Sequence, residues 1–263
     1  MSRRSAFTLI ETIVAVAITA ILVTMIAGAA GKALASSSLA VSANNIRQLA
    51  AGASAYLGDN NYTFWRYRQN ANTPATVHEL GVPERGVRWW YGFETLASLS
   101  APEGRRQFDP ALGPLAGYVP AAFRPDPSLS LAGKALKPKY QIGYVGIGYN
   151  VHLGGGWMGS APLRYFDLEN PGKTVVFATS AQVNTFQAPA STKNPMVEDF
   201  YGFDDGATGN QPSVHFRHNG RAMVVFASGN AGFLEMDPTT LDRRAPKANV
   251  GRFAPVGSRD FLR

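Results

Sequence analysis

The sequence predicts an α+β protein in which a long N-terminal helix, apolar enough in its first half to cross a membrane, packs on a C-terminal antiparallel β-sheet. Residues 7–30 form a nearly uninterrupted apolar run, and no proline occurs before Pro74. Residues 214–235 consist instead of short β-rich segments separated by turn signals. The chain of 263 residues is long enough to build a globular core beside such a helix.

The apolar run at residues 7–30 is long enough to span a bilayer core of about 30 Å, because a helix rises about 1.5 Å per residue. Arg3 and Arg4 precede the run, and Glu11 is its one charged residue. Positive charge before the span predicts that the N-terminus stays in the cytoplasm. An ionisable side chain inside an apolar span is a candidate functional site, so Glu11 needs a partner.

The residues "RRSAFTLIET" resemble the processing site of type IV prepilins and type II secretion pseudopilins. The resemblance implies cleavage between Ala6 and Phe7, and N-methylation of the new Phe7 amine, by a prepilin peptidase/methyltransferase. Ala6 stands where that family usually has glycine, and both residues are small. In a filament, the Glu11 carboxylate of one subunit would pair with the Phe7 amine of its neighbour. Such a pair would offset the cost of burying each charge and would fix the axial register.

Two alternatives to this interpretation stay open. Glu11 lies only one turn from the helix start, so its side chain would also reach the cytoplasmic interface without any partner. The segment "ALASSS" offers a secretory cleavage site after Ala35, although the apolar run is longer than the usual h-region of about 7–15 residues. In the second case the whole span would be discarded.

Residues 31–57 predict an amphipathic second half of the same helix. Gly28 and Gly31, near the junction, lower helix stability there by about 1 kcal/mol each relative to alanine. The apolar residues that recur at helical spacing, and that we expect to pack on the globular domain, are Leu39, Ile46, Leu49, Ala53, Tyr56 and Leu57.

Residues 58–237 have the composition of a globular domain. Residues 58–74 read as a polar and aromatic loop, and residues 74–140 as loops with short elements, among them a helix around residues 93–99. We expect the cluster "WWY" at residues 89–91 to anchor the core or an interface rather than to bind a ligand.

The sequence predicts β-strands in the later part of this domain. Asn219-Gly220 is the strongest hairpin signal, because both residues tolerate a positive φ. A second turn is expected at residues 228–230. The expected strands, adjacent and antiparallel at the C-terminal end, are residues 140–151, 173–180, 214–217, 221–227 and the segment after residue 230.

The hairpin "FRHNGRAMVVFASGNAGFL" resembles a signature of a large bacterial prepilin-like group, in which a histidine is followed ten residues later by Asp-Gly. Here His218 is followed by Ser228 and Gly229, so the acid is missing. The resemblance therefore supports the architecture, and any site that would use the lost aspartate is in doubt. We expect His218 to brace the hairpin turn.

Other candidate sites are weaker. Calcium binds six to eight oxygen ligands, and the acidic residues Glu198, Asp199, Asp204 and Asp205 are a weak calcium candidate, with a solvated loop as the alternative. Strand alternation sends His215 and His218 to different environments, which disfavours a metal pair. The absence of cysteine excludes disulfides and thiol chemistry.

Catalytic motifs are also missing from the sequence, so we predict no enzyme activity and no cofactor. Basic residues are scattered despite a net charge of +7, which disfavours nucleic acid as a partner. The basic segment 238–263 is expected to be an extended, solvated tail or to lie on an acidic neighbour.

The resemblance implies a structural pilin- or pseudopilin-like subunit that assembles through its helix, with itself or with other pilin-like subunits, into a pilus or a type II secretion pseudopilus. The expected location is the bacterial inner membrane, crossed once, with an extracytoplasmic C-terminal domain and a filament as the assembled form. The alternative is a membrane-anchored binding module that never polymerises and binds through its sheet and the loops at residues 89–91. The expected divisions are a leader (1–6), a transmembrane half-helix (7–30), an amphipathic half-helix (31–57), a globular domain (58–237) and a basic tail (238–263).

Overall fold

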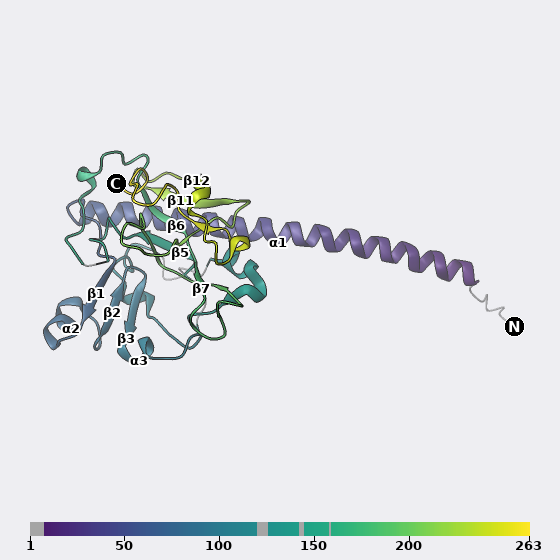
Figure 1. The fold of residues 1–263 in the computed structure, drawn as a ribbon, viewed down its shortest axis with the longest axis horizontal. Helices are drawn as coiled ribbons and strands as arrows, with labels where there is room; N and C mark the ends of the chain where they lie inside the picture. Colours follow the sequence, from purple (N-terminus) through teal and green to yellow (C-terminus); the bar gives the residue numbers. More distant parts are fainter. Residues whose placement is uncertain (1–7, 120–125, 142–144, 158) are drawn as a thin grey trace. The chain divides into compact units, whose positions relative to one another are not determined.

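The computed structural model describes residues 8–119, 126–141, 145–157 and 159–263. The chain divides into two units, residues 1–40 and residues 41–263. Helix α1 (Leu9–Asp59) contributes residues to both units as one continuous helix of 51 residues (Figure 1). The predicted long helix is thereby confirmed from Leu9 onward, whereas Phe7 lies outside the described residues.

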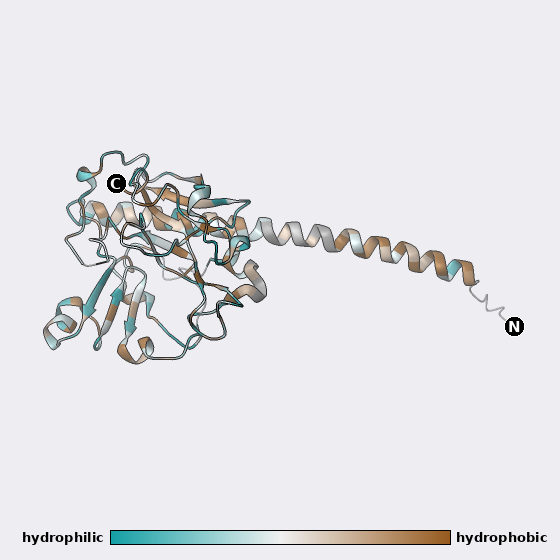
Figure 2. Cartoon of the chain, in the orientation of Figure 1, coloured by the Kyte–Doolittle hydropathy of each residue, from teal (hydrophilic) through white to brown (hydrophobic). Residues whose placement is uncertain are grey.

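In the first unit, no residue of the stretch Leu9–Ile26 of α1 is buried, and the stretch has a mean hydropathy of 2.5. It is the one helix, within the part of the chain that the structure describes, that is long and apolar enough to cross a membrane. Figure 2 shows this stretch as largely hydrophobic, interrupted near its start by a hydrophilic residue. Leu39, which we expected on the packed face, also belongs to this unit and is 36% exposed.

The second unit contains a five-stranded sheet in the order β12-β11-β6-β5-β9. All neighbouring pairs are antiparallel except β5 and β9, which are parallel. The sheet is therefore mixed at one edge, because β9 reaches β5 by a crossover and not by a hairpin. The strands are β5 (Ile147–Asn150), β6 (Val175–Thr179), β9 (Gly202–Phe203), β11 (Arg221–Phe226) and β12 (Ala231–Glu235).

The C-terminal part of α1 packs on one face of this sheet. Alternate residues of strand β11 point to opposite faces of the sheet and contribute to a different buried cluster on each face. Met223 and Val225 join the cluster that contains Ile46 and Leu49 of α1. Val224 belongs to a second cluster on the other face, together with Ala222, Phe203, Val214, Phe216 and Leu262.

Smaller elements surround this core. One antiparallel sheet contains β1 (Arg68–Ala71), β2 (Gly86–Trp89) and β3 (Gly92–Thr95). A second has the order β4-β8-β7, from β4 (Leu136–Lys137), β8 (Met196–Glu198) and β7 (Gln182–Asn184). β10 (Val214–His215) pairs with β13 (Val250–Gly251). The short helices are α2 (Pro74–Leu80), α3 (Leu96–Leu99) and 3-10 turns at Pro110–Leu112, Pro127–Ala135, Tyr165–Asp167, Pro238–Thr240 and Pro246–Ala248.

Both predicted C-terminal turns are confirmed. Asn219 and Gly220 have φ values of 54° and 76°, and Gly229 has a φ of 86°. The β11–β12 hairpin has the expected antiparallel register. The expected ladder between residues 214–217 and β11 is wrong, because β10 pairs with β13 and only a single bridge, His218 to Arg221, crosses the first turn.

Two further expectations are corrected. The helix predicted around residues 93–99 begins only at Leu96, because Phe93 pairs with Arg88 inside the β2–β3 ladder and Thr95 caps α3. The supposed loop at residues 58–74 contains strand β1, and its Trp65 is 1% exposed.

The segment 238–263 is part of the globular domain and not a solvated tail. Val250 and Gly251 form strand β13, and Leu262 is 5% exposed in the cluster beneath the sheet. Arg252 is also buried, with its guanidinium 3.5 Å from the Asp204 carboxylate. The expected division at residue 237 therefore does not exist within residues 41–263.

Candidate functional site

Thr8 and Glu11 form reciprocal hydrogen bonds at the start of α1. The backbone N–H and the hydroxyl of Thr8 each donate to Glu11 Oε2 at 2.8 Å. The Glu11 N–H donates in return to Thr8 Oγ1 at 3.3 Å. This is the capping box, which satisfies two helix-end N–H groups that otherwise lack partners. Glu11 therefore has a structural role inside its own subunit, which our reading of the sequence missed although the T-x-x-E spacing signals it.

The capping interaction leaves part of the carboxylate available. Both hydrogen bonds from Thr8 end on Oε2, and among the described residues no donor reaches Oε1 of Glu11. A negative charge in the first turn also interacts favourably with the helix dipole. Glu11 is thus held in a fixed orientation, while its Oε1 can still pair with a cationic group from outside the chain.

The surroundings of Glu11 are apolar and exposed. Leu9 and Ile10 are 79% and 73% exposed, and the large apolar side chains from Ile13 to Ile26 are at least 50% exposed. Burying such side chains is worth about 1.5–3 kcal/mol each. Contact with an apolar environment outside the chain would therefore stabilise this exposed part of α1. Ala6 and Phe7, between which the sequence predicts cleavage, lie outside the described residues.

The acidic residues of the calcium candidate have separate partners. Glu198 is 1% exposed and accepts from Lys137 Nζ at 2.8 Å and from Asn184 Nδ2 at 2.7 Å, with Lys139 Nζ at 3.3 Å. Burial by itself raises the pKa of Glu198, but the Lys139 charge and these hydrogen bonds lower it below its ordinary value. Its carboxylate is therefore already neutralised by cations of the chain.

Asp199 points in another direction from its neighbour. It is fully buried and accepts the backbone N–H groups of Val145 at 2.8 Å and Gly146 at 2.7 Å. Burial raises the pKa of Asp199 in spite of these bonds. The residue braces the chain just before β5.

Asp204 and Asp205 each have separate partners as well. Asp204 accepts from Trp157 Nε1 at 2.5 Å and from Asn210 Nδ2 at 2.6 Å. Asp205 accepts from the Ala207 N–H at 3.0 Å, and the Arg259 guanidinium lies 3.3 Å away.

The calcium expectation is not met among the described residues. A calcium site needs several oxygen ligands around one point, and these four carboxylates are instead divided among different partners. Within the part of the chain that the structure describes, no group of three or more His, Asp or Glu side chains could hold a metal ion.

The two histidines lie in different environments, as strand alternation predicted. His215 is buried, and its Nδ1 lies 3.1 Å from Nη1 of Arg217. His218 exchanges backbone hydrogen bonds with Arg221 across the turn, and its ring packs against Phe233. The predicted role of His218 in bracing the turn agrees with these contacts. Ser228, at the position of the lost acid, forms a hydrogen bond with Asn230.

The aromatic cluster at residues 89–91 belongs to the core. Trp89, Trp90 and Tyr91 are 7%, 1% and 5% exposed. Trp90 Nε1 donates to the Tyr201 carbonyl, and Tyr91 shares a hydrogen bond with Tyr140. These side chains therefore offer no exposed binding platform, which removes the part of the surface that the binding-module alternative placed at residues 89–91.

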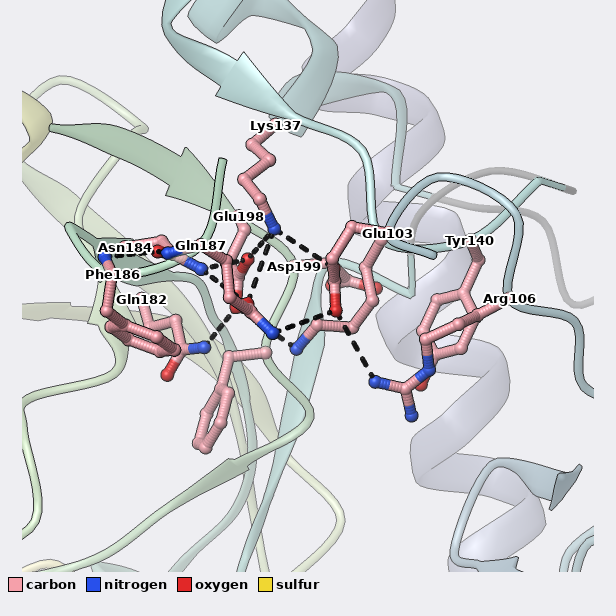
Figure 3. Close-up of polar contacts among 12 residues, drawn as sticks. Glu103, Arg106, Lys137, Tyr140, Gln182, Asn184, Phe186, Gln187, Glu198 and Asp199 are labelled. Carbon is pink, nitrogen blue, oxygen red and sulfur yellow. Dashed lines mark hydrogen bonds and ion pairs between the residues drawn. The ribbon is translucent and has the colours of Figure 1, made fainter. Parts of the chain in front are cut away.

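A buried network of charges was not predicted from the sequence. Arg106 donates two hydrogen bonds of 2.7 Å to Glu94. Glu103 lies between Arg106 and Lys137 and forms an ion pair with each. Figure 3 shows Lys137 between Glu103 and Glu198, and Gln187 Nε2 also donates to Glu103, at 3.3 Å. No sequence pattern reveals this network, because its members come from strands and loops that lie far apart in the sequence, from Glu94 to Glu198.

Comparison with known proteins bears on the N-terminal site. Residues 1–27 match the prokaryotic N-terminal methylation motif. This match supports the prepilin-type cleavage and methylation motif on the residues that include Ala6, Phe7 and Glu11. No curated protein and no solved structure gives a significant match to the chain. The signature expected at His218, Ser228 and Gly229 stays a prediction.

Proposed function

We propose that this protein is a structural pilin- or pseudopilin-like subunit, made as a precursor, cleaved between Ala6 and Phe7, methylated on the Phe7 amine and assembled through α1. The observation that carries the proposal is the methylation motif at residues 1–27, which includes the exposed apolar stretch Leu9–Ile26. A signal peptide would be discarded, whereas a filament subunit needs this stretch. The globular domain is then carried outside the membrane, as the basic residues before the span imply.

The assembly chemistry follows from the geometry at Glu11. Cleavage would turn Phe7 into a positively charged N-terminus. Thr8 already holds Oε2 of Glu11, and Oε1 is available to the Phe7 amine of a neighbouring subunit. A carboxylate fixed by a cap loses little further freedom when it pairs, so the pair would specify register at a small entropic cost.

The mature N-terminus tests the proposal directly. Terminal peptide mass spectrometry on the protein from membranes of its native host should find a chain that begins with methylated Phe7. A chain that begins at Ser36 would establish secretory cleavage and would refute the proposal. An unprocessed Met1 end would equally remove the filament interpretation.

Substitutions at the cap separate the two roles of Glu11. Glu11→Gln keeps an oxygen that can accept from Thr8 but removes the negative charge. Thr8→Ala removes the hydroxyl contacts of the cap but keeps the charge and the backbone N–H donor. If the charge sets the register, Glu11→Gln and Glu11→Ala both disorder or block filaments, whereas Thr8→Ala still assembles. Membrane insertion should be unchanged in all three. Normal filaments from Glu11→Gln would show that Glu11 acts only as a cap.

A further inference from the structure

The β4-β8-β7 sheet brings a lysine, a glutamate and a carboxamide to one point. Lys137 lies opposite Glu198 in the β4–β8 register, and Asn184 lies on β7, on the other side of β8. Lys137 Nζ is 2.8 Å and Asn184 Nδ2 is 2.7 Å from the same atom, Glu198 Oε2. The two nitrogen atoms are therefore no farther apart than the sum of these two distances (Figure 3).

All three side chains are removed from water. Lys137 and Glu198 are each 1% exposed, and Asn184 is fully buried. Lys137 Nζ also lies 3.0 Å from Glu103 Oε2. Electrostatic interactions are stronger in such a site than in water, and no bulk water competes there with the amine as a nucleophile.

The carbonyl of Asn184 is polarised by two backbone donors. Asn184 Oδ1 accepts the N–H of Phe186 and the N–H of Gln187, each at 3.0 Å. Two fixed backbone N–H groups on a carbonyl oxygen are the arrangement that stabilises the oxyanion of a tetrahedral intermediate. The same two bonds orient the carboxamide, so that its nitrogen faces Glu198.

We propose that Lys137 and Asn184 form an intramolecular amide bond, with Glu198 as the proton carrier. Glu198 accepts a proton from the Lys137 ammonium group, and the free amine attacks Cγ of Asn184. The N–H groups of Phe186 and Gln187 stabilise the charge on Oδ1. Glu198 then transfers protons from the attacking nitrogen to Nδ2, the Cγ–Nδ2 bond breaks, and one ammonium ion leaves. The lysine ammonium and the carboxamide become a secondary amide and ammonium, without any oxidation or reduction.

Gln187 is the competing carboxamide. Its Oε1 lies 3.5 Å from Lys137 Nζ, and its Nε2 donates to Glu103 at 3.3 Å. Gln187 makes no hydrogen bond to Glu198 among the described residues, and no pair of backbone donors is described on its carbonyl oxygen. The proton carrier and the oxyanion donors are both at Asn184, so the geometry favours Asn184.

The bond would have a clear structural effect. It would connect β4 to β7 across β8 and close the chain between residues 137 and 184. A covalent closure reduces the entropy of the unfolded chain, as a disulfide does. The chain has no cysteine, so a disulfide cannot supply this closure. This inference is independent of the proposed role in filaments.

Peptide mapping of the full chain, purified in detergent, tests the bond. Trypsin cleaves after Lys134, Lys139, Lys173 and Lys193, but not between Lys137 and Pro138. We expect one branched peptide that joins residues 135–139 to residues 174–193, lighter than the two separate peptides by one ammonia, with fragmentation placing the branch at Asn184. Lys137→Arg, Asn184→Ala and Glu198→Gln should each lose the branched peptide.

Lys139→Arg is the matched control, because Lys139 also lies close to Glu198 and its replacement leaves the same trypsin sites. It should retain the branched peptide. Separate peptides of unchanged mass from the folded wild-type protein would overturn the proposal, whatever the variants do. A branch at Gln187 would overturn the assignment to Asn184.

Discussion

The two stretches of α1 that lie in different units both carry large apolar side chains, yet the burial of these side chains is opposite. In Leu9–Ile26 no residue is buried. In the second unit, Ile46, Leu49 and Leu57 are 1%, 2% and 6% exposed. The difference shows that apolar composition alone does not produce a core. The second stretch meets a sheet of its own domain, whereas the first needs lipid or another subunit to cover it.

The largest expected effect comes from truncating the buried stretch. Leu49→Ala should lower the free energy of unfolding of the domain by about 2–5 kcal/mol, because it leaves a cavity in the core. Leu22→Ala, in the exposed stretch, should leave this free energy unchanged. Denaturant unfolding followed by tryptophan fluorescence measures both, since the described tryptophans all lie in the second unit. Equal effects would contradict the division into two regions.

A charge in the exposed stretch should affect the membrane and not the domain. Val16 is 64% exposed, and Val16→Arg places a cation near the middle of the span at a cost to insertion of about 2.5–3.5 kcal/mol. We expect a smaller fraction of the protein in isolated membranes and unchanged domain unfolding. Leu49→Ala is the control, because its membrane fraction should stay at the wild-type level. Full membrane recovery of Val16→Arg would argue against a spanning helix.

Two glycines in the second stretch of α1 differ in the space that an added side chain would find. A Cβ on Gly52 would lie 2.6 Å from Val119 Cγ2 and 3.0 Å from the Tyr118 carbonyl oxygen, whereas a Cβ on Gly58 would meet nothing within 4 Å. Gly52→Ala should therefore destabilise the domain by about 1–3 kcal/mol through overpacking. Gly58→Ala should stabilise it by up to about 1 kcal/mol through helix propensity. The same unfolding assay tests the opposite signs, and stabilisation by Gly52→Ala would show that this contact is absent.

A last expected effect is a pH dependence of stability that belongs to the second region alone. Burial, followed by the charge of Arg217, lowers the pKa of His215 well below its ordinary value. The unfolded chain binds a proton at this histidine below about pH 6.5, and the folded chain does not. Stability should therefore be full above that pH and fall by about 1.4 kcal/mol per pH unit below it.

His215→Gln isolates this contribution. We measure the free energy of unfolding of this variant between about pH 6.5 and 5. Its slope against pH should be smaller than that of the wild type, because the variant lacks the one proton that the unfolded wild-type chain binds at His215. Membrane insertion should not change over the same range. An unchanged slope would mean that His215 is protonated in the folded domain as well.

Sequence patterns predicted the elements that depend on local chemistry. Helix α1 follows from an apolar run without proline, and the turn at Asn219 and Gly220 follows from residues that accept a positive φ. The N-terminal motif is equally local, which is why residues 1–27 could be interpreted before any fold was known. The capping box of Thr8 and Glu11 is also local, because the T-x-x-E spacing signals it.

Pairings between distant segments were not predictable in this way. Strand β10 pairs with β13, although β11 is its nearest strand along the chain. Glu198 looked like one of four neighbouring acids, yet its partners come from β4 and β7. Spacing along the chain carries no information about such contacts, because they depend on how loops of many residues close.

The sequence by itself determined the long helix, its exposed apolar start, the position of Glu11 and the β-rich C-terminal region, since each depends on residues within a few turns or strands of one another. Only the tertiary structure decided that segment 238–263 joins the core, that the acidic residues are separated, and that Lys137, Glu198 and Asn184 meet in a buried site. The physical reason is that burial and charge pairing depend on the packing of distant segments, whereas helix and turn formation depend on neighbouring residues.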